Sequence, residues 1–250
     1  MSQSVFISGS IAIKTLPAKV KESILKIMEQ NMTILVGDAS GIDTLIQDLC
    51  NVQSYTNLIV YTITPLPRYL SNQSSNFRHI FVDSDIKKER ERQTHKDKAM
   101  SDDSTFSLVI WDGHSKGSYA NIKRAIEQSK KVKVFYSKIN DFIQNDKVTL
   151  IEIKYLYHEN NGYTATEVIK HLQENGIEAY KRSQDLNKFL LDEGLLNKEG
   201  TVYKPTNKNP DLFIVETYRG KAKGVKFNNK FIDWIEQNTQ KQQLYTDSLF

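Results

Sequence analysis

The sequence predicts an α/β fold in which helices cover both faces of a mostly parallel sheet. Short apolar runs rich in β-branched residues alternate with segments whose apolar residues recur at helical spacing. Small-residue turns containing glycine and serine follow several of these runs. Strands that alternate with helices are typical of a parallel sheet, because a crossover must carry the chain back to the start of the next strand.

The alternation occupies the first part of the chain. Strands are expected at residues 5–8, 33–36, 58–61, 106–111 and 132–136, with a further short strand at 80–82. Helices are expected from Pro17 to Met28, from Ile42 to Leu49, over 85–100 and over 118–129. Residues 1–136 are therefore predicted to form a Rossmann-like domain, and the polar residues 137–159 a linker or an extra helix.

The remaining residues, 160–250, predict a small winged-helix-like α+β module. Thr164 and Glu167 have the spacing of a capping box at the start of one helix, and Ser183 is expected to cap a second. Short strands are expected at 201–203 and 212–215, and a last helix around 231–235.

Composition excludes several classes of protein. The chain of 250 residues is 39% hydrophobic and 26% charged, as in ordinary globular domains. No apolar run approaches the roughly 18 residues of a membrane helix, and the first residues do not resemble a signal peptide. Cys50, the single cysteine, excludes an internal disulfide, and the histidines lack metal-ligand spacing. We expect a cytoplasmic protein with no metal and no membrane partner.

The segment between the second strand and the second helix is the first candidate binding site. Its glycines would let the backbone approach a ligand closely, and the helix that follows would present unpaired N–H groups to a phosphate. The alternative is a helix-capping turn without a ligand. The candidate residues are Gly37, Asp38, Ala39, Ser40, Gly41 and Asp43.

Two further small-residue loops follow other strands. In a parallel sheet all three loops emerge at one edge, where the ligands of open α/β sheets bind. Asp112 is an acceptor suited to a ribose or a base edge. The candidates in these loops are Gly9, Ser10, Asp112, Gly113, Ser115, Gly117 and Ser118.

A charged stretch and one isolated arginine supply candidate contacts to a phosphate. Arg92, Lys96 and Asp97 could share one side of a helix, and Arg78 follows a polar loop. The alternative for these residues is a solvated helix face.

Three motifs in order resemble the SLOG superfamily, which includes the DprA, LOG and YspA-like groups. They are GDASGID at 37–43, RQTHKD at 92–97 and WDGHSKGSYANI at 111–122. The resemblance implies a Rossmann-like fold and a nucleotide-related ligand, in some antiviral members one derived from ADP-ribose. In the enzymatic branches a carboxylate is expected where this chain has Asn121, which lowers the expectation of N-glycosidic cleavage by that route.

The C-terminal module is similar to the KilA-C domain of phage antirepressors over about residues 160–237. The resemblance implies a phage or mobile-element setting and a DNA or protein partner. Basic residues between 219 and 230 could contact phosphates, or could form a solvated hairpin. They are Arg219, Lys221, Lys223, Lys226 and Lys230.

The leading hypothesis is a ligand sensor. The first domain would bind a nucleotide-derived small molecule and relay its presence to the C-terminal module. The alternatives are a hydrolase or transferase acting on an N-glycosidic or phosphoribosyl bond, with Asp43, Asp97 and Asp112 as candidate carboxylates, and a DNA-binding regulator. A homo-oligomer is expected at the level of the family.

Overall fold

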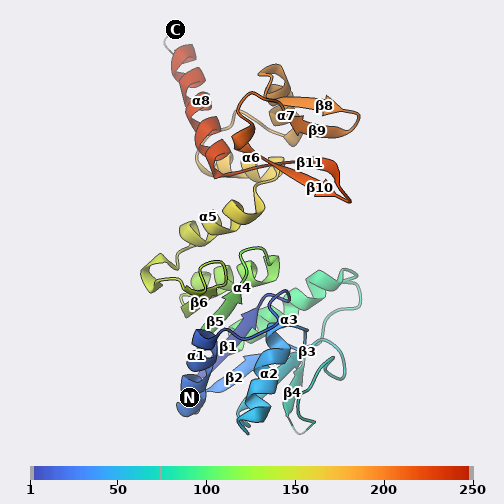
Figure 1. Cartoon of the computed structure of the whole chain (residues 1–250), viewed down its shortest axis with the longest axis vertical. Helices are drawn as coiled ribbons and strands as arrows, with labels where there is room; N and C mark the ends of the chain where they lie inside the picture. Colours follow the sequence, from blue (N-terminus) through green and yellow to red (C-terminus); the bar gives the residue numbers. More distant parts are fainter. Residues whose placement is uncertain (1–2, 74, 248–250) are drawn as a thin grey trace. The chain divides into compact units, whose positions relative to one another are not determined.

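The computed structural model describes residues 3–73 and 75–247, with side chains up to residue 239, and the chain divides into two compact units (Figure 1). The first unit spans residues 1–154 and the second 155–250. The boundary falls inside helix α5 (Leu150–Asn161). Each unit has a hydrophobic core of its own.

The first unit is built on one sheet whose strand order, within the described residues, is β4-β3-β2-β1-β5-β6-β7. The neighbours from β4 to β6 pair in parallel, and β7 pairs antiparallel with β6. The α/β class with a mostly parallel sheet is therefore confirmed. The strands are β1 (Ser4–Gly9), β2 (Thr33–Val36), β3 (Leu58–Thr62), β4 (Asn76–His79), β5 (Phe106–Trp111), β6 (Lys131–Tyr136) and β7 (Asp141–Phe142).

Helices cover both faces of this sheet, because alternate side chains of β1 enter different cores. Val5 and Ile7 belong to a buried cluster that includes Ile24 of α1. Phe6 belongs to another cluster with Met100 of α3. The helices of this unit are α1 (Ala18–Glu29), α2 (Ile42–Val52), α3 (Glu89–Asp103) and α4 (Lys116–Glu127).

The strand order reverses at β1, which has β2 on one side and β5 on the other. After β1 the chain turns to a helix on one face of the sheet, and after β5 it turns to a helix on the other face. Open α/β sheets bind their ligands at such a point. The loops after Gly9 and Trp111 lie at this switch point.

Two expectations about the first unit need correction. The strand expected at 80–82 is wrong: β4 is Asn76–His79, and Phe81 lies outside it and is 84% exposed. Among the described residues β4 pairs only with β3, as an edge strand, and it exposes all four side chains, so it has no apolar pattern to reveal it. In the segment expected as a linker or extra helix, β7 extends the sheet, η1 (Asn145–Lys147) follows, and α5 begins.

The second unit is a small α+β domain with two antiparallel strand pairs, β8 with β9 and β10 with β11. Its core includes Leu186, Leu190, Phe227, Phe231 and Ile235. No helix among the described residues is both long enough and apolar enough to cross a membrane. The elements are α6 (Ala165–Glu174), α7 (Ser183–Asp192), β8 (Leu196–Glu199), β9 (Val202–Pro205), η2 (Pro210–Leu212), β10 (Phe213–Tyr218), β11 (Lys221–Phe227) and α8 (Asn229–Asp247).

The two predicted helix caps of this unit have different outcomes. The capping box is confirmed: the Glu167 backbone N–H donates to Thr164 Oγ1 at 3.3 Å, and the Thr164 N–H donates to the Glu167 carboxylate at 2.8 Å. The cap at Ser183 is wrong, because Ser183 is already the first residue of α7 and Arg182 is its N-cap. The Asp185 carboxylate accepts from the Arg182 N–H at 3.0 Å and so places the start one residue earlier.

Candidate functional site

The loop after β2 depends on glycines because other groups fill the space beside its backbone. A Cβ on Gly37 would lie 2.3 Å from Asp43 Oδ2 and 3.0 Å from Lys96 Nζ. Gly41 has a φ of +87°, and a Cβ there would lie 2.7 Å from the Cα of Ile11. Both glycines are therefore required by close packing of the chain itself, with side chains beside Gly37 and the Ile11 backbone beside Gly41.

Asp38 is the centre of a buried ion-pair cluster under this loop. Its Oδ1 accepts from Lys96 Nζ at 2.8 Å and from Arg68 Nη2 at 2.7 Å, and its Oδ2 accepts from the Arg68 backbone N–H at 3.2 Å. The Asp38 side chain is fully buried and that of Lys96 is 3% exposed. Burial alone would raise the pKa of Asp38, but the two cations outweigh it and hold that pKa well below its usual range.

Two members of this network were not predicted from the sequence. Arg68 lies in the loop after β3, and its Nη2 also lies 3.4 Å from Gln93 Oε1. Gln47 is buried in α2, where its Nε2 donates to the Gly37 carbonyl at 3.0 Å and its Oε1 accepts from the Ser71 N–H at 3.3 Å. A glutamine within the apolar stripe of a helix was a usable signal for Gln47. Arg68 has no comparable signal, because its partner is 30 positions away.

Two carboxyl groups beside this cluster hold protons more tightly than usual. Burial raises the pKa of Asp43 to about 6, against the opposing effect of Lys96, while Asp43 Oδ2 accepts from the Ala39 N–H at 3.1 Å. Burial also raises the pKa of Asp97, against the effects of Lys96 and Arg124. A carboxyl group that titrates near neutral pH can act as a proton donor or acceptor.

The two loops at the switch point are joined through Ser10. This serine is fully buried, its Oγ accepts from the Asp112 N–H at 3.1 Å, and it lies 3.4 Å from Ser118 Oγ. Ser115 caps α4 by accepting from the Ser118 N–H at 3.3 Å. The first strand and the first turn of α4 are thereby held together.

Asp112 has a structural use within its own loop. Its Oδ1 accepts from the backbone N–H groups of His114 at 2.9 Å and Ser115 at 2.7 Å. Gly113, with a φ of +84°, makes the turn between Asp112 and these two residues. The sequence suggested Asp112 as an acceptor for a ribose or a base. In the structure one of its two carboxylate oxygens is already engaged.

The other predicted residues are divided between the site and the rest of the unit. Gly9 packs tightly at the end of β1, because a Cβ there would lie 2.4 Å from Ile42 Cγ1. Ser40 is exposed in the loop after β2, and Gly117 is exposed in the first turn of α4. Arg92 lies one helical turn before Lys96, with its Nε 3.8 Å from the carboxylate of Glu89.

Arg78 is not brought to this edge. Its guanidinium contacts the Asp103 carboxylate at 2.6 Å, and the Asp103 carbonyl accepts from Ser4 Oγ at the start of β1. Arg78 therefore reaches toward the opposite, amino-terminal edge of the sheet.

Asn121 is the residue at which the sequence resemblance predicts a carboxylate in an enzyme. It is buried, and its Oδ1 accepts from Arg124 Nη1 at 2.7 Å. It also hydrogen bonds to the carboxyl group of Asp97. Asp97 is thus an acidic group in direct contact with Asn121.

Helix α2 offers the clearest place for an anion. It begins after Gly41, which has no side chain to cap the first N–H groups. Those groups lie at the positive end of the helix dipole, next to the exposed Ser40. Within residues 3–73 and 75–247, no group of three or more His, Cys, Asp or Glu side chains could hold a metal ion.

Comparison with protein-family models and with curated proteins gives no match to this chain. The function is therefore argued from the chemistry of the site.

Proposed function

We propose that the first unit binds a nucleotide-derived small molecule at the carboxyl-terminal edge of its sheet. The observation that carries the proposal is the glycine loop 37–41, which is backed by the Asp38–Lys96–Arg68 cluster and leads into an uncapped helix. An exposed hydroxyl and free helical N–H groups would hold a phosphate.

The switch-point loops supply the second half of this site. Ser10 links the end of β1 to the start of α4, so the loop after β5 has a fixed position beside β1. A phosphate at α2 and a ribose or base toward Asp112 and Ser115 would span the carboxyl ends of β2, β1 and β5, which are adjacent strands. This span suits an elongated ligand such as ADP-ribose better than a single phosphate.

The proposal predicts where a bulky side chain blocks binding. Ser40 and Gln53 are exposed residues at the two ends of α2. Purified full-length chain is screened by thermal shift against mononucleotides, cyclic nucleotides, ADP-ribose and its cyclic form. A ligand present at 100 times its Kd adds about 2.7 kcal/mol of stability, which a melting curve resolves.

We expect one ligand class to raise the Tm of the wild type and of Gln53→Trp, but not of Ser40→Trp. An equal rise in both variants would place the ligand elsewhere. A flat screen in which all three proteins melt cooperatively would count against nucleotide binding by this unit.

A second candidate function, binding of double-stranded DNA, is favoured by the hairpin of β10 and β11. Lys226 pairs with Glu216 at 3.0 Å and Lys230 with Asp211 at 3.3 Å. In the described part of the chain Arg219, Lys221 and Lys223 have no ion-pair partner, and the Arg219 guanidinium lies 5.2 Å from the ring centroid of the exposed Tyr218. Of the five predicted basic residues, three thus remain available near the hairpin turn.

The test for this second function is the salt dependence of DNA binding. Replacing Arg219, Lys221 and Lys223 by alanine should weaken binding across sequences. It should also lower the slope of log K against log salt by about one for each phosphate that is no longer neutralised. Lys226→Ala is the matched control, because its ammonium is already paired. DNA binding that is absent, or that is unchanged in the triple variant, would remove this candidate.

A further inference from the structure

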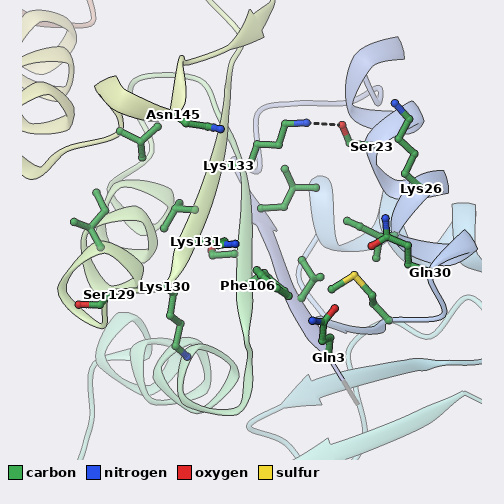
Figure 2. Close-up of a pocket in the computed structure, with 18 residues that line it drawn as sticks. Gln3, Ser23, Lys26, Gln30, Phe106, Ser129, Lys130, Lys131, Lys133 and Asn145 are labelled. Atoms are coloured by element: carbon green, nitrogen blue, oxygen red, sulfur yellow. Dashed lines mark hydrogen bonds between the residues drawn. The ribbon is translucent and has the colours of Figure 1, made fainter. Parts of the chain in front are cut away.

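A groove of about 860 Å³ opens at the amino-terminal edge of the same sheet, away from the glycine loop (Figure 2). It lies between the second half of α1 and the segment 145–148, over the starts of β1, β5 and β6. All of its lining residues belong to the first unit. Its volume is within the roughly 300–1,000 Å³ typical of pockets for small molecules.

The floor of the groove is apolar. Val5 and Phe106 are paired neighbours in the sheet, and Leu108 follows on the same face. Ile27 of α1 and Met32 complete the apolar surface. Such a floor binds hydrocarbon or aromatic surface rather than a bare inorganic ion.

Four lysines line the groove, and none of the lining residues is acidic. Two of the lysines are engaged: Lys130 donates to the Ser104 carbonyl at 2.7 Å, and Lys133 donates to Ser23 Oγ at 3.2 Å. The ammonium groups of Lys26 and Lys131 have no hydrogen-bond or ion-pair partner within the described ranges. Figure 2 shows Lys26 on the α1 side of the groove and Lys131 toward the middle of its floor.

We propose that this groove binds a small amphiphilic organic anion. An apolar body would cover Phe106, Leu108 and Ile27, and a carboxylate or phosphate head group would contact the free ammonium groups of Lys26 and Lys131. The two surfaces are complementary to such a ligand: the floor selects apolar surface, and the uncompensated lysines select negative charge. The site does not depend on the proposed nucleotide site at the other edge.

Calorimetric titration of the full chain tests the ligand chemistry. Decanoate and decyl phosphate carry the same chain with different anionic heads, decanol lacks the charge, and inorganic phosphate lacks the chain. All are used below their micelle concentrations. We expect at least one of the two anions to bind, with decanol and inorganic phosphate at least tenfold weaker. The preferred head group then identifies the ligand class as carboxylate or phosphate.

Lysine replacements test the location. Lys26→Gln with Lys131→Gln should weaken binding of the preferred anion at least tenfold. Lys21→Gln with Lys98→Gln removes two exposed charges elsewhere in the same unit and should leave binding within twofold. Circular dichroism checks that both double variants are folded. Equal binding by the two double variants, binding of decanol as tight as that of the anions, or no binding of either anion would overturn the proposal.

Discussion

The two edges of the sheet use lysine in opposite ways. At the carboxyl-terminal edge Lys96 is buried and bound to Asp38, whereas at the amino-terminal edge Lys131 is exposed and unpaired among the described residues. A buried ammonium requires its counterion, while an exposed one is free to meet a ligand. The charge of Lys96 is therefore neutralised within the fold, whereas no described residue neutralises the charge of Lys131.

The largest expected effect follows from breaking the buried pair. Lys96→Gln leaves the buried carboxylate of Asp38 with Arg68 alone, and removal of one partner of a buried pair typically costs about 3–5 kcal/mol. We expect a loss of about 3 kcal/mol, at the lower end, because Arg68 remains.

Urea unfolding measures this loss. The chain has two tryptophans, one in each unit, so in a Trp234→Phe background the fluorescence of Trp111 reports on the first unit. A change below about 1 kcal/mol would mean that the pair is no stronger than an ordinary surface pair.

The next effect is a pH dependence from Asp43. Its pKa is raised to about 6 in the folded chain, above the roughly 3.9 of an unfolded aspartate, so the folded state binds the proton more tightly. The contribution of Asp43 to the free energy of unfolding should therefore rise as pH falls from about 7 to about 4, by about 2–3 kcal/mol.

The variant Asp43→Asn should lose that part of the pH dependence. Asp97, whose pKa is also raised, contributes in the same direction in both proteins, and because its charge raises the pKa of Asp43 the difference between them includes that coupling. Parallel unfolding curves at pH 7.5 and pH 5 give the comparison. An identical pH response in the two proteins would show that Asp43 titrates normally.

The glycine loop gives a third, smaller effect. Gly37→Ala forces the carboxylate of Asp43 to move, because the new Cβ would lie 2.3 Å from its Oδ2, and overpacking of this kind costs about 1–3 kcal/mol. The control is Gly117→Ala in the first turn of α4, where the nearest atom is 4.0 Å from a built Cβ. That control should be neutral or stabilising by up to about 1 kcal/mol. Equal destabilisation by both changes would contradict the close contact at Gly37.

The smallest effect is expected at the other edge. Lys131→Gln should change the free energy of unfolding by no more than about 0.5 kcal/mol, because an exposed, unpaired charge contributes little to stability. The same urea experiment measures it beside Lys96→Gln. A loss above about 1.5 kcal/mol would show that Lys131 stabilises the fold and that its ammonium is not free to contact a ligand.

Sequence patterns predicted the buried strands of the first unit well and its long-range pairs poorly. Runs such as 33–36 and 106–111 are apolar because both faces of a parallel strand are covered. The edge strand β4 has no such pattern, since its side chains are exposed and its backbone pairs on one side. The apolar run at 80–82 predicts a strand there instead, and that prediction is wrong.

The candidate site shows the same division. Glycine loops are visible in sequence because their residue type reflects a local backbone requirement. Of the two partners of Asp38, Arg68 is not visible in sequence, because it reaches Asp38 from a loop without periodic pattern. Arg78 and Lys96 looked alike in sequence, yet Arg78 pairs with Asp103 and Lys96 with Asp38. Only the three-dimensional path of α3 and β4 separates them.

The most direct test of the central claim is an amide chemical-shift titration of the full chain with the ligand that the thermal screen selects. Binding at the carboxyl-terminal edge predicts the largest shifts in residues 37–41 and 112–118, with the amides of Lys26 and Lys131 unmoved. Shifts confined to the groove at the other edge, or to the second unit, would contradict the account.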